Sequence, residues 1–197
     1  MTKYDKMKQI RDELVAGTSL PLYNYRTENK FHPVIGEGSH DAHIMFVGEA
    51  PGLNEAKQGR PFCGASGKFL DEMIASIGLQ RAIVYITNIV KDRPPENRDP
   101  TDDEIAAYSN YLDRQIEIIQ PKVIATLGRF SMTYIMRKFD LDLELAPISK
   151  IHGTEFNARA SYGPISIVTL YHPAGALYNG GMRATHIKDF GVLKKYV

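Results

Sequence analysis

The chain has 197 residues, of which 43% are hydrophobic and 24% are charged, and its formal net charge is +1. This length predicts a single domain over residues 1–197 with a sizeable core. No segment approaches the run of about 18 apolar residues that a membrane span needs, so no membrane partner is expected. The near-neutral charge gives no overall attraction to nucleic acid, and a polyanion would have to be held by a local basic face.

Cys63 is the only cysteine, which excludes an internal disulfide framework and a metal site built from several cysteines. We interpret it as a small packed side chain rather than a reactive thiol. The N-terminal segment carries charges at helical spacing and lacks the apolar region of a secretory signal. We therefore expect a cytoplasmic protein that works as a monomer.

Helical periodicity and end signals predict five helices along the chain. The first ends at Gly17, and Thr101 with Glu104 forms a capping box for a later one. A connector rich in Pro, Tyr and Asn follows the first helix, and a proline-rich polar loop covers residues 91–100. The helices are expected over residues 2–15, 66–77, 101–119, 128–139 and 183–196.

Short apolar runs bounded by turn residues predict buried strands over residues 44–47, 83–87, 123–127 and 165–170. These strands alternate with helices, which favours a parallel sheet covered by helices on both faces. The expected fold class is therefore α/β: a three-layer α/β/α sandwich with a central, mostly parallel four-stranded sheet.

Three of the strand ends carry side chains suited to binding or catalysis. Glu49 lies in the turn from Gly48 to Gly52, Asn88 closes the second strand, and His172 follows the last strand. Ligands of open α/β sheets bind beyond the carboxyl ends of the strands, so we expect these groups in one crevice. The alternative for each is an ordinary turn or a structural polar residue.

Longer motifs follow one another along the chain: GEAPG with Glu55 after it, GRPFCG, VYITNIVKDRPPENRDP, QIEIIQPKVIATLG and HPAGAL. Together they make the chain similar to the family 4 uracil-DNA glycosylases, from about residue 20 to about residue 190. The resemblance implies the uracil-DNA glycosylase fold. It also implies hydrolysis of the N-glycosidic bond of deoxyuridine in single- or double-stranded DNA, leaving an abasic site without cleaving the strand.

One departure from the family is large. Family 4 enzymes resemble four-cysteine iron–sulfur proteins, and at the matching positions this chain has Gly17, Leu20, Asp92 and Tyr108. A cluster held by cysteine thiolates cannot form with these residues, so we expect no iron–sulfur cluster, no metal site and no other cofactor. Packing, such as Leu20 against Tyr108, is expected to hold the loop over residues 91–100 instead.

The resemblance also implies roles within the pocket. Phe62 would stack on a base flipped out of the helix, and Asn88 would pair with the edge of uracil. The catalytic residues would be His172, donating to uracil O2 as negative charge grows there, and Glu49, acting on the sugar cation or as a general base. Glu55 would exclude the methyl group of thymine, and the alternative is a solvent-exposed glutamate at the start of a helix. The residues expected to bind substrate are Gly48, Ala50, Gly52, Glu55, Phe62 and Asn88.

An apolar wedge, Leu177, would enter the duplex and offset the cost of unstacking a nucleotide. Tyr178 follows it where the family usually has arginine. The residues expected to contact DNA are Lys68, Lys91, Arg93, Arg98, Leu177, Tyr178 and Arg183. For each cation, a solvated surface charge is the alternative.

Two other functions stay open at this level. The chain could be a glycosylase for another base, such as hydroxymethyluracil, hypoxanthine or xanthine. It could also be a non-catalytic protein that binds uracil or abasic sites in DNA. A substrate panel separates the first alternative, and binding without turnover would indicate the second.

Overall fold

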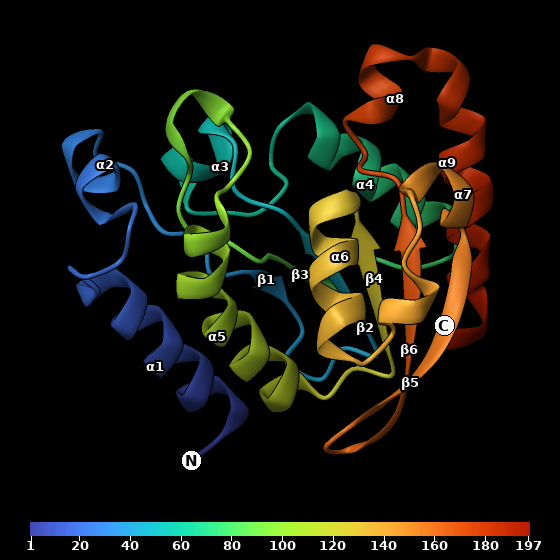
Figure 1. The fold of residues 1–197 in the computed structure, drawn as a ribbon, viewed down its shortest axis with the longest axis horizontal. Helices are drawn as coiled ribbons and strands as arrows, with labels where there is room; N and C mark the ends of the chain where they lie inside the picture. Colours follow the sequence, from blue (N-terminus) through green and yellow to red (C-terminus); the bar gives the residue numbers. More distant parts are fainter.

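The computed structural model describes residues 1–197 and contains one mixed sheet with the strand order β1-β3-β2-β4-β6-β5 (Figure 1). The central strands β3, β2, β4 and β6 are parallel, whereas β1 and β5 pair antiparallel at the two edges. The strands are β1 Glu37–Gly38, β2 Ile44–Gly48, β3 Tyr85–Asn88, β4 Val123–Leu127, β5 Thr154–Ala160 and β6 Gly163–Leu170. The α/β class and the parallel core are confirmed, but the sheet has six strands instead of four.

Nine α-helices surround or extend this sheet. They are α1 Lys3–Ala16, α2 Tyr23–Glu28, α3 Leu53–Gln58, α4 Ala65–Ser76, α5 Asp102–Ile119, α6 Arg129–Lys138, α7 Ile148–Ile151, α8 Gly175–Tyr178 and α9 Arg183–Phe190. Short 3-10 turns occupy Arg81–Ile83, Pro95–Asn97, Asp142–Glu144, Gly180–Met182 and Gly191–Tyr196. The expected C-terminal helix therefore ends at Phe190 and continues as a 3-10 turn.

Helices cover both faces of the sheet (Figure 1). Side chains of a strand alternate between the faces, and in β2 Met45 and Val47 join the core under α1, α5 and α6. Ile44 and Phe46 point the other way, into the core under α4 and α9. The three-layer α/β/α arrangement is the result.

The two edge strands that periodicity did not predict depend on pairing rather than on their own residues. β1 has only two residues and is defined by its bridge to β3. β5 has the polar sequence TEFNARA and forms a hairpin with β6. Because an edge strand buries little side-chain surface, its sequence carries a weak apolar signal.

The pairing register brings the ends of the parallel strands together. Gly48 pairs with Asn88, and Leu127 pairs with Leu170. Beyond these pairs, the N–H of Val90 donates to the carbonyl of Glu49, at 3.0 Å. The turns that follow β2, β3, β4 and β6 therefore share one edge of the sheet, as expected for the site. No helix has both the length and the apolar character required to cross a membrane.

Candidate active site

A cavity of about 520 Å³ opens at this edge of the sheet. Its volume falls within the range of ligand pockets in proteins. Its walls come from the turn after β2, from α3, the start of α4, α8 and the loop after β3. The predicted site residues that line it are Glu49, Ala50, Gly52, Glu55, Phe62, Asn88, Arg98, His172, Leu177 and Tyr178. Sequence reasoning missed the lining residues Pro51, Leu53, Asn54, Gly64, Ala65, Ser66, Pro94, Asn97 and Ala174.

Asn88 carries an unpaired acceptor in this pocket. The side chain is 1% exposed, and its Oδ1 is buried without a hydrogen-bond partner from the protein. Buried polar atoms are almost always paired, so this one indicates a ligand group with a donor. Gly48 makes the arrangement possible, because a Cβ there would lie 2.3 Å from Asn88 Oδ1 and 2.7 Å from the ring of Phe62. Gly48 therefore supports the pocket from behind rather than lining it.

His172 presents a neutral imidazole to the pocket. Its Nδ1 accepts a hydrogen bond from the backbone N–H of Ala174 at 3.2 Å, so the proton of the neutral ring lies on Nε2. Burial and the nearby His186 lower the pKa of His172 to about 4. The ring of His172 is 5.7 Å from that of Phe62. At neutral pH, His172 is thus a hydrogen-bond donor without a charge.

Glu49 lies in the turn after β2 and lines the pocket. Burial and the nearby charge of Asp99 together raise the pKa of Glu49 to about 7, against the opposing effect of Arg129. Asp99 and Arg129 form an exposed ion pair with an N–O distance of 2.5 Å. A carboxyl group with a pKa near neutrality can accept a proton at physiological pH.

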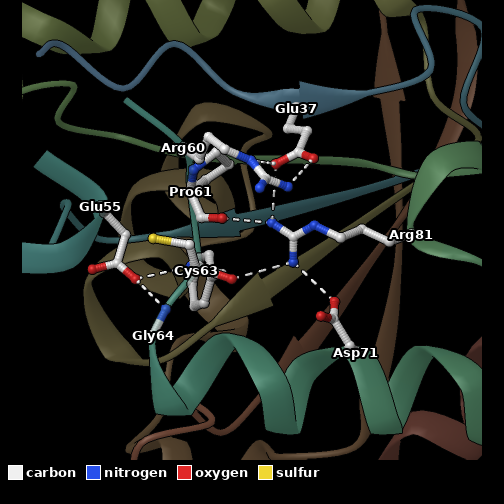
Figure 2. A network of polar contacts seen from close by, with 9 residues as sticks. Glu37, Glu55, Arg60, Pro61, Cys63, Gly64, Asp71 and Arg81 are labelled. Atoms are coloured by element: carbon white, nitrogen blue, oxygen red, sulfur yellow. Dashed lines mark hydrogen bonds and ion pairs between the residues drawn. The ribbon is translucent and has the colours of Figure 1, made fainter. Parts of the chain in front are cut away.

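Phe62 occupies an unusual turn between Pro61 and Cys63, the two neighbours that are labelled in Figure 2. Its φ of 46° lies in the left-handed region, which bulky residues rarely adopt. Glu55 holds the following residues, since its Oε1 accepts hydrogen bonds from the N–H groups of Cys63 at 2.9 Å and Gly64 at 3.0 Å. Phe62 is 6% exposed, so its ring forms a wall of the pocket with little solvent access. The position fits a stacking platform.

The prediction that Lys91 contacts DNA is wrong. It is 0% exposed and cannot contact a DNA phosphate. Its Nζ donates to the carbonyl of Asn88 at 2.6 Å, to Gln115 Oε1 at 2.6 Å and to Thr87 Oγ1 at 2.7 Å. Burial lowers the pKa of Lys91, whereas three close acceptors favour the protonated amine that can satisfy them all. Lys91 fixes the backbone of Asn88 from behind the pocket.

The other predicted DNA contacts differ in their surroundings. Lys68 is exposed and makes no ion pair. Arg98 lines the pocket and pairs with Glu104. Arg93 turns toward α2, where it donates to the hydroxyl of Tyr25 at 2.9 Å. Arg183, the first residue of α9, forms an ion pair with Glu72 on α4. None of these cations except Arg98 reaches the pocket itself.

Two large side chains project at the mouth of the pocket. Leu177 is 46% exposed and Tyr178 is 90% exposed, both on α8. Exposed apolar side chains beside a cavity mark a contact surface more often than scattered ones do. Both residues line the pocket and are open to solvent.

The sequence matches the uracil DNA glycosylase superfamily over residues 35–191. The chain belongs to this superfamily. A type-4 uracil-DNA glycosylase of Sulfurisphaera tokodaii is 47% identical, over 97% of this chain and 84% of that protein. Another, of Archaeoglobus fulgidus, is 45% identical over 84% of this chain and 81% of that protein. A type-4 uracil-DNA glycosylase of Thermotoga maritima is 35% identical, over 100% of this chain and 97% of that protein.

The residues at the four positions where the resemblance to family 4 implies cluster cysteines do not fit an iron–sulfur cluster. Gly17 and Leu20 offer no ligand atom, because glycine has no side chain and the leucine side chain is a hydrocarbon. The two residues pack closely, since a Cβ on Gly17 would lie 2.8 Å from the side chain of Leu20. Asp92 and Tyr108 instead bond to each other, the hydroxyl donating to Oδ2 at 2.6 Å. No group of three or more His, Cys, Asp or Glu side chains is arranged to hold a metal ion.

A buried polar network holds this region. Arg26 donates to both carboxylate oxygens of Asp92 at 3.1 and 3.0 Å, and to the carbonyls of Leu14 and Val15 at the end of α1. The expectation of apolar packing alone is therefore incomplete: Leu20 packs against the core that contains Tyr108, but an ion pair ties the loop after β3 to α1 and α2. That loop carries Pro94, Asn97 and Arg98 to the pocket.

Proposed function

We propose that this chain is a monofunctional uracil-DNA glycosylase, which hydrolyses the N-glycosidic bond of deoxyuridine in DNA and leaves an abasic site. One observation carries the proposal: Asn88, with its unpaired Oδ1, and His172, with its proton on Nε2, line the same pocket as Phe62. An acceptor, a donor and an aromatic face are the groups that a flipped uracil requires. The type-4 relatives support the same activity.

Asn88 accounts for the choice of base. Its Oδ1 would accept from N3–H of uracil, and its amide group would donate to O4. Cytosine presents the opposite pattern, with an acceptor at N3 and a donor at N4. A buried amide left unpaired by the wrong base lowers the rate of its excision. Glu55, which lies against Gly52 in the pocket wall, would exclude the methyl group of thymine.

Bond cleavage leaves the electron pair of the C1′–N1 bond on uracil, and negative charge develops at O2. The Nε2–H of His172 would donate to this oxygen, as donors do in oxyanion sites. A water molecule then adds to C1′ of the sugar and loses a proton. Ionised Glu49 would stabilise the sugar cation and accept that proton. Uracil takes a proton from solvent when it leaves.

No lysine lines the pocket, which supports a simple hydrolysis rather than a Schiff-base mechanism that cleaves the strand. Leu177 and Tyr178 would fill the gap left by the flipped nucleotide, and Lys68 and Arg98 would contact phosphates. We further propose that the chain acts as a monomer, inside the cell, on single- and double-stranded DNA.

Labelled oligonucleotides with one uracil test this function. Purified protein should release free uracil and leave a site that alkali cleaves, whereas matched oligonucleotides with cytosine or thymine should stay intact. A panel with hydroxymethyluracil, hypoxanthine and xanthine identifies a different base preference. Tight binding to uracil or abasic DNA without release of any base would show a non-catalytic binder.

A further inference from the structure

The turn that presents Phe62 is held by charged side chains on both sides (Figure 2). On one side, the carboxylate of Glu55 accepts from the N–H groups of Cys63 and Gly64. On the other side, the guanidinium of Arg81 donates to the carbonyl of Pro61 at 2.5 Å and to the carbonyl of Phe62 at 3.3 Å. The peptide unit between Phe62 and Cys63 is thus bound at its oxygen by a cation and at its nitrogen by an anion.

Arg81 reaches this turn from a different part of the fold. It begins the short 3-10 turn before β3, and its side chain is only 18% exposed. Asp71 on α4 accepts from Nη1 at 2.9 Å, and Glu37 on β1 lies 3.4 Å from Nη2. These carboxylates orient the planar guanidinium, so that its fork faces the two carbonyls.

The backbone of Phe62 needs such support. A positive φ at a bulky residue is maintained only when the surroundings determine it. The packing behind the turn is equally tight, since a Cβ on Gly67 would lie 1.8 Å from the carbonyl oxygen of Phe62. Ring position depends on this backbone, and the ring contacts both Gly48 and His172.

We propose that Arg81, oriented by Asp71, is a positioning residue that holds Phe62 in its left-handed conformation and so places the aromatic platform for the flipped base. This inference rests on the proposed function, because a flipped uracil is what the ring of Phe62 would stack on. Arg81 does not line the pocket. It acts on excision through Phe62 alone.

A double-mutant cycle on single-turnover excision tests the dependence on Phe62. Loss of correct placement lowers reaction rates by up to about 100-fold, so Arg81→Ala should slow excision by about 10- to 100-fold. Asp71→Ala, which removes a half-exposed carboxylate, should slow it by a few fold. In a Phe62→Ala background, Arg81→Ala should change the rate by less than about threefold, because coupled residues are non-additive.

Arg60 provides a matched control. It pairs with the same Glu37, at 2.7 Å, but donates to no carbonyl of the turn. Arg60→Ala should keep the wild-type rate, and affinity for abasic DNA should stay unchanged in all these variants. Arg81→Lys, which can reach one carbonyl, should recover part of the rate and covers the case in which Arg81→Ala does not fold.

An NMR measurement of the contact between the Phe62 and His172 rings does not depend on activity. Arg81→Ala and Asp71→Ala should weaken that contact, and Arg60→Ala should not. Full additivity of Arg81→Ala with Phe62→Ala, a wild-type rate for Arg81→Ala, or an unchanged ring contact would overturn the proposal. If the wild-type protein excises no uracil, the proposed function fails, and the ring contact alone still decides whether Arg81 positions Phe62.

Discussion

The backbone N–H of Ala174 donates to Nδ1 of His172 at 3.2 Å, which fixes the tautomer of the neutral imidazole. The proton on Nε2 is then available to a ligand in the pocket. His172→Ala should lower single-turnover uracil excision by about 100- to 1,000-fold, the usual effect of removing one oxyanion donor. Affinity for abasic DNA should change little. His43→Ala, an exposed residue at the opposite end of β2, is the control and should keep full activity.

The pH dependence of the rate should follow Glu49. Its pKa is raised to about 7, so the ionised form that stabilises the sugar or accepts a proton accumulates as pH rises through neutrality. The excision rate should rise with pH to a plateau above about pH 8, and the apparent pKa of this rise should be about 7. The pKa of His172, about 4, predicts no loss of the neutral donor over this range.

Glu49→Gln should remove that pH dependence and lower the plateau rate by about 100-fold or more, the usual contribution of one general base. Rate profiles under single-turnover conditions measure both effects. A rising limb that persists unchanged in Glu49→Gln would assign the titration to another group.

Asn88→Ala should strongly lower the rate of uracil excision, because it abolishes recognition of the uracil edge. It removes both the unpaired acceptor and the amide donor, and discrimination of this kind is worth about 100-fold or more in rate. Parallel assays with uracil and cytosine substrates check that the loss affects uracil without a gain on cytosine. Retention of more than about half the wild-type rate would contradict the pairing role.

The buried pair of Arg26 and Asp92 should matter for stability. Asp92→Asn leaves a buried guanidinium without its anion, at a cost of about 3 to 5 kcal/mol. Tyr108→Phe removes one buried hydrogen bond, at a cost of about 1 to 3 kcal/mol. Urea unfolding measures both. Asp41→Asn, which breaks an exposed pair with Lys3, is the control and should leave the unfolding midpoint nearly unchanged.

The central part of this fold is predictable from local sequence because its signals are strong. The strand over Val123–Leu127 has the predicted bounds, and Thr101 and Glu104 make both hydrogen bonds of the expected capping box. The edge strand Thr154–Ala160 lacks such a signal, because its polar residues become a strand only through pairing with β6.

Some residues of the site can also be predicted from the sequence, and others cannot. Glu49, Asn88 and His172 are predictable since parallel strands place their carboxyl ends together. Lys91 is not, because lysine is almost always exposed, and its burial depends on acceptors such as Gln115 from a distant helix. Arg81 follows no motif either. Its role depends on the approach of the turn at Pro61, 20 residues away in the sequence.

Release of free uracil tests the central claim most directly. Wild-type protein, His43→Ala and His172→Ala are incubated with a uracil-containing oligonucleotide, and the released base is identified by mass spectrometry. We predict that wild-type protein and His43→Ala release uracil and leave an abasic site, while His172→Ala releases about 100-fold less. Intact uracil DNA after incubation with well-folded wild-type protein would contradict the claim.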